Sequence, residues 1–227
     1  MPPEPTNQSP DLLINLIRDK YPLILGFLLV LFLIGAFIAP VFMKAGKWNA
    51  AEIVYRFYSN FCHQFAHRSW FLYGEQAHYP ADVKSGSSLE TYSQAFGNDI
   101  EDDQLARSTI GNDKIGFKVA VCQRDVAIYF GLVLFCIVFQ LGKRKLSKIS
   151  LWLWLAIGVA PMGIDGTIQF ISGMDFFAKL GLTHESDPFL RSLTGFLFGL
   201  FTGWYLLPAI EETFIDNKTR EALINAD

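Results

Sequence analysis

The sequence predicts an all-α, polytopic membrane protein: a four-helix transmembrane bundle with an extracytoplasmic interfacial helix and a loop insertion. Apolar residues make up 51% of the 227 positions and aromatic residues 15%, which exceeds the usual composition of soluble domains. The apolar residues gather in four runs, and a helix of about 20 such residues crosses the ~30 Å hydrocarbon layer. A net charge of −3, with no basic groove and no zinc-finger spacing, argues against a nucleic-acid partner.

The four apolar runs differ in length and in the polar residues that they contain. The first contains no charge, whereas the second reaches full length only if "GFKVAVCQRD" continues its helix. The third carries Asp165 and Gln169, and the fourth carries Arg191 near its start. The predicted spans are about 21–43, 120–141, 149–171 and 189–208, flanked by an N-terminal tail over 1–20 and a C-terminal tail over 211–227.

Orientation follows from the short connection "GKRKLSKIS" between the second and third spans. Its cluster of Lys and Arg predicts a cytoplasmic loop, since short loops rich in these residues stay inside. Both termini are then expected in the cytoplasm of a cell-membrane protein. Lys44 and Lys47 run against this assignment, and Arg18 and Lys20 agree with it.

The connection over 44–117 is therefore expected outside. Residues 49–73 resemble a helix without a spanning core, and its many aromatic residues suit the membrane interface. Residues 74–116 are acidic, rich in Gly, Ser and Asn, and show little periodicity. We expect an exposed, partly ordered insertion there.

Two clusters, "SNFCHQFAHRSWF" and "VCQRDVAIY", hold the residues that could bind a metal. His63 and His67 are four apart, as on one face of a helix, and Cys122 and Asp125 share a stripe. Thiolate, imidazole and carboxylate groups are the ligands of tetrahedral zinc, and iron is also considered. The expected metal ligands are Cys62, His63, Cys122 and Asp125.

Two other interpretations of the cysteines stay open. Cys62 and Cys122 are both expected outside, where thiols tend to form disulfides, and such a bond would join the loop helix to the second span. Alternatively both are free thiols. Cys136 lies in the middle of the second span and is expected to be an ordinary small apolar residue.

Ionisable residues within spans generally face the interior of a bundle or a water-filled cavity. Asp165 falls near the outer end of the third span, and it shares a stripe with Gly158, Met162 and Gln169. We expect an Asp165–Arg191 ion pair, either as a structural brace or as part of a pocket for an anionic head group. The pocket residues would be Arg68, Arg124, Asp165, Gln169 and Arg191.

Gly195, Gly199 and Gly203 recur every four residues along the fourth span. Small residues at this spacing let a neighbouring helix approach closely. We expect this groove to pack within the monomer; the oligomeric state is not predicted.

The stretches "CHQ" from Cys62, "RSWFLYG" from Arg68, "VCQRDVAIYFG" from Val121, "PMGIDGTIQ" from Pro161 and "LRSLTGFLFG" from Leu190 resemble a family of predicted membrane proteins, domain of unknown function 2085. The resemblance implies a small helical membrane protein with this polar set as its signature, and it implies no activity. Two features depart from the family pattern. Asp125 stands where a second cysteine is frequent, and the insertion lengthens a connection that is usually short.

Three functions are considered. The first is a metal-dependent enzyme acting on an amphipathic or lipid-linked anion, in contact with membrane lipid. The second is a non-catalytic component, braced by a disulfide, that binds a protein partner through its outer loop. The third, a transporter or proton pathway through Asp165, is disfavoured because no inverted repeat is found.

Overall fold

The computed structural model describes residues 8–81, 88–97, 103–172 and 186–224. Four of its helices are long and apolar enough to cross a membrane, namely Ile17–Lys44, Gln123–Leu141, Leu151–Ser172 and Pro188–Phe214. The prediction of an all-α polytopic membrane protein is thereby confirmed. The described part of the chain adds one small three-stranded sheet, which the sequence did not lead us to expect.

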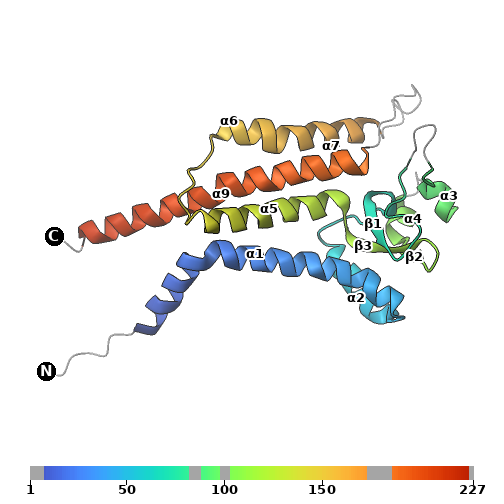
Figure 1. The fold of residues 1–227 in the computed structure, drawn as a ribbon, viewed down its shortest axis with the longest axis horizontal. Helices are drawn as coiled ribbons and strands as arrows, with labels where there is room; N and C mark the ends of the chain where they lie inside the picture. Colours follow the sequence, from blue (N-terminus) through green and yellow to red (C-terminus); the bar gives the residue numbers. More distant parts are fainter. Residues whose placement is uncertain (1–7, 82–87, 98–102, 173–185, 225–227) are drawn as a thin grey trace.

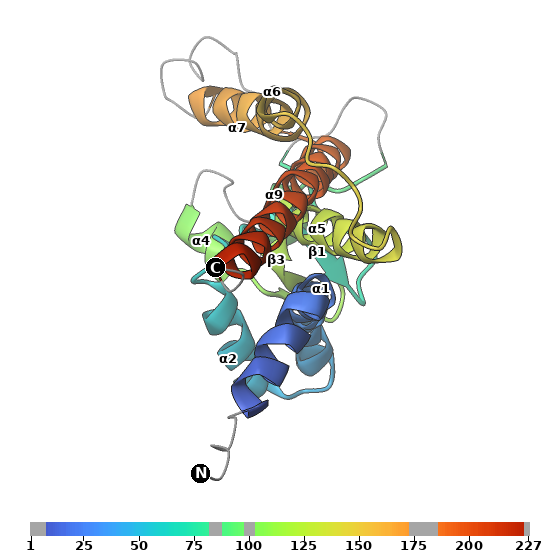
Figure 2. The same cartoon turned by 90° about the vertical axis from the view of Figure 1, so that its left-hand side faces the viewer.

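The helices lie side by side along one direction (Figure 1). Helix α1 (Gln8–Lys44) packs against α5 (Gln123–Leu141), and α5 packs against α9 (Pro188–Ile224). The third span consists of α6 (Leu151–Leu153), the π-helical turn η2 (Trp154–Val159) and α7 (Ala160–Ser172), and it packs on α9. Viewed from the end, the third span and α1 lie on opposite sides of α9 and α5 (Figure 2).

Glycine spacing brings α5 and α9 into close contact. A methyl group on Gly199 would lie 2.0 Å from the Ile128 carbonyl oxygen, and one on Gly195 would lie 2.6 Å from the Arg124 carbonyl oxygen. The α5 residue Gly131 makes the reciprocal approach to α9. The expectation that this groove packs within the monomer is confirmed, because only a hydrogen side chain leaves room for the facing backbone.

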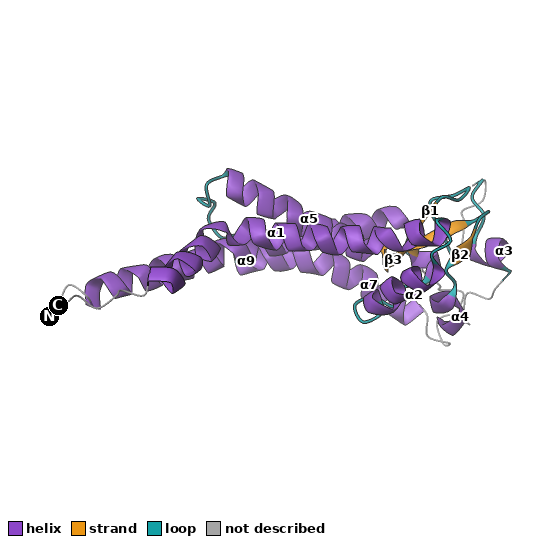
Figure 3. Ribbon diagram, turned by 90° about the horizontal axis from the view of Figure 1, so that it is seen from below, coloured by secondary structure: helices purple, strands orange, loops and turns teal. Residues whose placement is uncertain are grey.

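A small subdomain lies at the opposite end of the molecule from both termini (Figure 3). It contains the strands β1 (Ser69–Leu72), β2 (Gly111–Asn112) and β3 (Gly116–Cys122), with the antiparallel order β1-β3-β2. Its short helices are α2 (Trp48–Tyr58), the 3₁₀ turn η1 (Ala66–Arg68), α3 (Tyr92–Phe96) and α4 (Asp103–Ser108).

Two expectations for this region are wrong. The helix expected over 49–73 ends at Tyr58, since the chain then turns and enters β1. "GFKVAVC" forms the central strand β3 rather than a continuation of the second span, so α5 begins at Gln123. A run buried on both faces of a strand is apolar throughout, and periodicity alone does not distinguish it from a buried helix.

The insertion is more ordered than its composition indicates. Four of its residues form one buried cluster together with Ala66 and Phe71. The four are Tyr79, Tyr92, Ala106 and Ile115. Thr91 caps α3 through a reciprocal capping box with Gln94, which satisfies the free N–H groups at the start of a helix. The parts of 74–116 that the structure describes are therefore a folded unit attached to the sheet.

Candidate functional site

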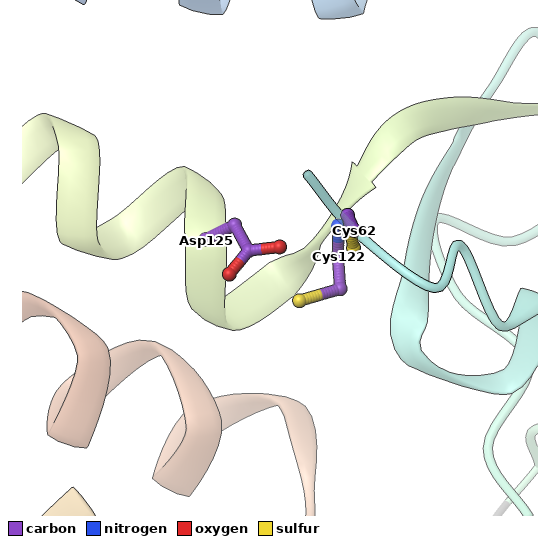
Figure 4. Close-up of side chains that lie close together, drawn as sticks. All are labelled: Cys62, Cys122 and Asp125. Carbon is purple, nitrogen blue, oxygen red and sulfur yellow. Dashed lines mark hydrogen bonds between the residues drawn. The ribbon is translucent and has the colours of Figure 1, made fainter. Parts of the chain in front are cut away.

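Three potential metal ligands meet where the subdomain joins the second span. Cys62 lies in the turn after α2, Cys122 is the last residue of β3, and Asp125 lies in the first turn of α5. One ligand atom from each residue lies within 4.8 Å of the other two. Figure 4 shows the Cys122 sulfur and the Asp125 carboxylate beside the loop that carries Cys62. Residues sixty positions apart in the sequence thus form one cluster.

Backbone contacts hold the two cysteines together. The Cys122 amide donates a hydrogen bond to the Cys62 sulfur at 3.3 Å. Gln64 adopts a positive φ of 57°, and its side chain donates hydrogen bonds of 2.9 Å to the carbonyls of Tyr55 and Ala120. This buried amide ties the turn after α2 to β3, and so sets the distance between the two thiols.

Hydrogen bonding, burial and nearby charge change the pKa of Cys122 in this cluster. Hydrogen bonding with Cys62, reinforced by burial and by the negative charges of Cys62 and Asp125, raises the pKa of the Cys122 thiol. A group of acids brought this close holds its protons unless a cation offsets the charge. A metal ion that binds this cluster must displace those protons, so its binding would strengthen as the pH rises.

Lys118 is a buried base close to Cys62 that the sequence analysis did not single out. It is 1% exposed, and its ammonium group donates hydrogen bonds to the carbonyls of Gln64, at 2.8 Å, and Arg107. Burial lowers the pKa of Lys118 to about 7, while the charge of Cys62 acts in the opposite direction. The signal in the sequence was a single lysine within the apolar run "GFKVAVC".

His63 lies outside the cluster of three. Its ring is exposed and stacks on Phe65, with 5.8 Å between ring centres. The helical relationship expected between His63 and His67 is wrong, because α2 ends at Tyr58 and His67 lies in the turn η1. His67 is buried and stacks on the same Phe65 ring.

A second polar cluster joins α5 to the third span. Asp165 pairs with Arg124 and accepts a 3.0 Å hydrogen bond from the Ser186 hydroxyl. The expected Asp165–Arg191 pair is therefore wrong. Arg191 is buried and donates to the His67 carbonyl at 3.5 Å, so it connects α9 to the subdomain.

The remaining predicted pocket residues lie at different places. Gln169 is buried on the same stripe as Asp165. Arg68 stands over the Phe65 ring, with 5.1 Å from its guanidinium carbon to the ring centre. Five buried side-chain atoms of α5 and α7 make no hydrogen bond to a described residue: Gln123 Oε1, Arg124 Nε, Gln140 Oε1, Asp165 Oδ1 and Gln169 Nε2.

The disulfide interpretation is not realised in the structure, where Cys62, Cys122 and Cys136 are free thiols. Cys136 packs with Phe135, Phe139 and Leu207 between the spans. The proximity of Cys62 to Cys122 suits either a shared metal ion or a disulfide.

A cavity of about 390 Å³ opens beside Cys62. Its walls come from the turn after α2 and from α4, and comprise Ser59, Asn60, Phe61, Cys62, His63, Gln64, Gln104, Arg107 and Ser108. Sequence reasoning did not place α4 near the cysteines, because the two segments lie far apart in the chain and meet only through tertiary packing.

Comparison with known proteins confirms the resemblance. Residues 106–205 match the sequence model of a family described as predicted membrane protein (DUF2085). An uncharacterised protein of Methanocaldococcus jannaschii is 29% identical over 199 residues, which cover 85% of this chain and 94% of the relative. No solved structure matches. Cys122, Asp125 and Asp165 lie within the family match, whereas Cys62 precedes it.

Proposed function

We propose that this predicted membrane protein holds one thiophilic metal ion, zinc or iron, between Cys62, Cys122 and Asp125. The observation that carries the proposal is the convergence of two sulfurs and a carboxylate within 4.8 Å. Ligands about 2.3 Å from a tetrahedral zinc lie roughly 3.8 Å from one another, so small side-chain movements would complete the site. Sulfur donors favour zinc or iron over magnesium or calcium.

Charge balance supports the same assignment. Two thiolates and one carboxylate around a divalent ion leave one negative charge, which the ammonium of Lys118 would offset. Lys118 lies close enough to Cys62 for the sulfur's charge to raise its pKa against the effect of burial. A metal that fixes the thiolates would thus keep this buried lysine protonated.

A three-ligand site suits catalysis better than a purely structural role. Structural zinc sites are usually closed by four protein ligands, whereas catalytic ones keep a position for water or substrate. Bound here, the ion would supply a water of lowered pKa for hydrolysis. We therefore propose a metal-dependent enzyme acting on an amphipathic or lipid-linked anion, with the cavity beside Cys62 as the approach to the metal.

The proposal also includes an orientation. The basic loop with Lys143, Arg144, Lys145 and Lys148 lies at the same end of the helices as both termini (Figure 1). By the distribution of positive charge this end is cytoplasmic, and the metal cluster faces the extracytoplasmic side.

The first test is the metal content per chain of gently purified protein, with Cys62→Ser and Cys136→Ser as a matched pair. Each variant removes one thiol, but Cys136 packs between the spans away from the cluster. We expect about one zinc or iron in the native protein and in Cys136→Ser, and none in Cys62→Ser. Since Cys62 is also part of a buried core, cobalt loading of the native protein gives independent evidence through thiolate-to-metal absorption.

The absence of metal from native protein prepared without chelators, together with no thiolate absorption on cobalt loading, would refute the metal centre. A second function would then lead, favoured by the proximity of the two sulfurs: a non-catalytic component with a Cys62–Cys122 disulfide that binds a protein partner through residues 74–116. Mass spectrometry of alkylated, non-reduced protein distinguishes the two, because a disulfide leaves only Cys136 to react.

A further inference from the structure

Two side chains that can contact an anion, Arg107 and His63, line the cavity beside Cys62. Arg107 stands over the Phe65 ring, with 5.0 Å from its guanidinium carbon to the ring centre, and Arg68 lies 5.1 Å from the same centre. His63 stacks on this ring as well. Among the residues that line the cavity, Arg107 carries a positive charge and none is Asp or Glu. A cation in a cleft without a facing carboxylate favours an anionic ligand.

Arg107 is positioned rather than freely mobile. Its carbonyl accepts a hydrogen bond from the buried Lys118 ammonium, which anchors the end of α4 to β3. Its guanidinium is held by the face of Phe65 through a cation–π attraction. No ion pair joins Arg107 to an acid in the described part of the chain, so its forked donors are available to a phosphate or carboxylate.

The part of the cavity wall formed by Phe61 is apolar. Phe61 lines the cavity, and it ends an exposed stripe on and after α2 that also contains Ile53 and Phe57. The three residues are four apart, and α2 presents buried residues on its other face. An exposed apolar face of this kind lies in the interfacial region of a bilayer.

The depth of this wall follows from its contacts with the spans. Phe61 packs against Phe32 of α1, with 5.4 Å between ring centres, and Phe32 packs against Tyr129 of α5 at 4.9 Å. Tyr129 lies six residues into α5, or about 9 Å below its first residue. The apolar wall therefore reaches hydrocarbon depth, while Arg107 belongs to the subdomain beyond the end of α5.

We propose that this cavity binds an anionic amphiphile, the phosphate-bearing head group of a lipid in the leaflet next to the subdomain. Arg107 and His63 contact the phosphate, and the acyl chain follows the stripe of Ile53, Phe57 and Phe61. The inference deepens the proposed function, on which it rests for the identification of this lipid as substrate. Cys62 lines the cavity and belongs to the metal cluster, so a head group held here lies next to the ion.

The experiment is a titration of detergent-purified full-length protein with dihexanoyl phosphatidic acid, followed by native mass spectrometry. The same spectra count bound lipid and bound metal on each chain. The variants are Arg107→Ala and, as its control, Arg56→Ala. Arg56 is an exposed arginine on α2 that pairs with Glu52 and does not line the cavity. Phe57→Ser, at an exposed position, probes the acyl contact without disturbing a buried core.

We expect Arg107→Ala to weaken lipid binding about tenfold or more, as befits a lost charge-assisted hydrogen bond, with the metal count unchanged. Arg56→Ala should bind like the native protein, and Phe57→Ser should bind more weakly. Lipid binding without metal would leave this inference standing and overturn the proposed metal centre. Equal binding by Arg107→Ala and Arg56→Ala would overturn the inference.

Competition with inorganic phosphate distinguishes a lipid head group from a free phosphate ion as the bound anion. We expect inorganic phosphate to compete with the lipid only weakly, because it lacks the acyl contact. Competition at the affinity of the lipid, together with native binding by Phe57→Ser, would show that the cavity takes a free anion and would contradict the assignment to an amphiphile.

Discussion

At the scale of single residues, Lys118 is a buried lysine whose pKa is set by its surroundings in the folded protein. Its ammonium group is enclosed between β3, the turn at Gln64 and the end of α4. Two carbonyl oxygens replace the water that it loses, but they carry only partial charge, so the cost of burying a full charge is not recovered. The lowered pKa of about 7 expresses that cost.

This lysine predicts a rise in stability with pH. Between about pH 7 and 10.5 the folded state holds fewer protons than the unfolded state, because the pKa of Lys118 falls from 10.5 to about 7 on folding. The free energy of unfolding therefore increases from about pH 7 upward, by roughly 1.5 kcal/mol up to about pH 8.5. Urea unfolding of metal-free protein in a mild detergent measures it.

The matched controls are Lys118→Met and Lys114→Met. Lys114 is exposed on the same subdomain, so its replacement should keep the rise, whereas Lys118→Met should remove it. A rise of the same size in both variants would assign the effect to another group. The test stays below about pH 8.5 because the raised pKa of Cys122 gives the opposite slope at higher pH.

The residues of the two clusters could be predicted only in part. Cys62, Cys122 and Asp125 were expected together because their segments were placed on the same side of the membrane, and the structure brings them together. The partner of Asp165 was predicted wrongly as Arg191, because Arg124 and Arg191 are both expected at its depth. The choice depends on the direction in which each arginine leaves its helix, and that direction is set by tertiary packing.

At the scale of elements, the contact between α5 and α9 rests on glycine. The carbonyls of Arg124 and Ile128 on α5 approach the glycines of α9 closely enough that any side chain would collide with backbone. Backbone cannot move aside as the end of a flexible side chain can, so these positions tolerate no added volume. The third span lacks such a constraint at Gly163, where an added methyl group would meet nothing within 4 Å.

Gly199→Ala and Gly163→Ala therefore form a matched pair. Gly199→Ala would place a methyl group 2.0 Å from the Ile128 carbonyl oxygen, and we expect it to lower stability by about 2 kcal/mol or more. Gly163→Ala should be neutral or stabilising by up to about 1 kcal/mol, since alanine is the better helix former. Thermal unfolding in one detergent compares them. Equal unfolding temperatures would contradict the α5–α9 packing.

Elements formed by local interactions could be predicted from the sequence, whereas elements that need partners far away in the chain could not. Spans need only a local run of apolar residues, and the four apolar runs of the sequence correspond to four helices long and apolar enough to cross a membrane. Strand β3 needs partners from β1 and β2, which the local run "GFKVAVC" does not reveal. The same reason explains the insertion, whose buried core joins Tyr79, Tyr92, Ala106 and Ile115 across segments without periodicity.

At the scale of the whole molecule, the ends of the protein differ in charge and in structure. The basic loop after α5 lies with both termini at one end, and the subdomain lies at the other (Figure 3). Arg144 joins three segments at the first end, since it donates to the Arg18 carbonyl at 2.8 Å and lies 3.5 Å from Glu211. From the distribution of positive charge, we expect the subdomain end to face outward.

Accessibility to an impermeant thiol reagent tests that orientation in intact cells. Ser93 on α3 and Ser147 in the basic loop are both exposed and lie at opposite ends of the molecule. In a background where Cys62, Cys122 and Cys136 are serine, we expect Ser93→Cys to be labelled in intact cells. Ser147→Cys should be labelled only after lysis, because the cluster of Lys and Arg holds its loop in the cytoplasm. The reverse pattern would place the metal cluster and the lipid cavity on the cytoplasmic face, and would reassign the proposed ligand to the inner leaflet.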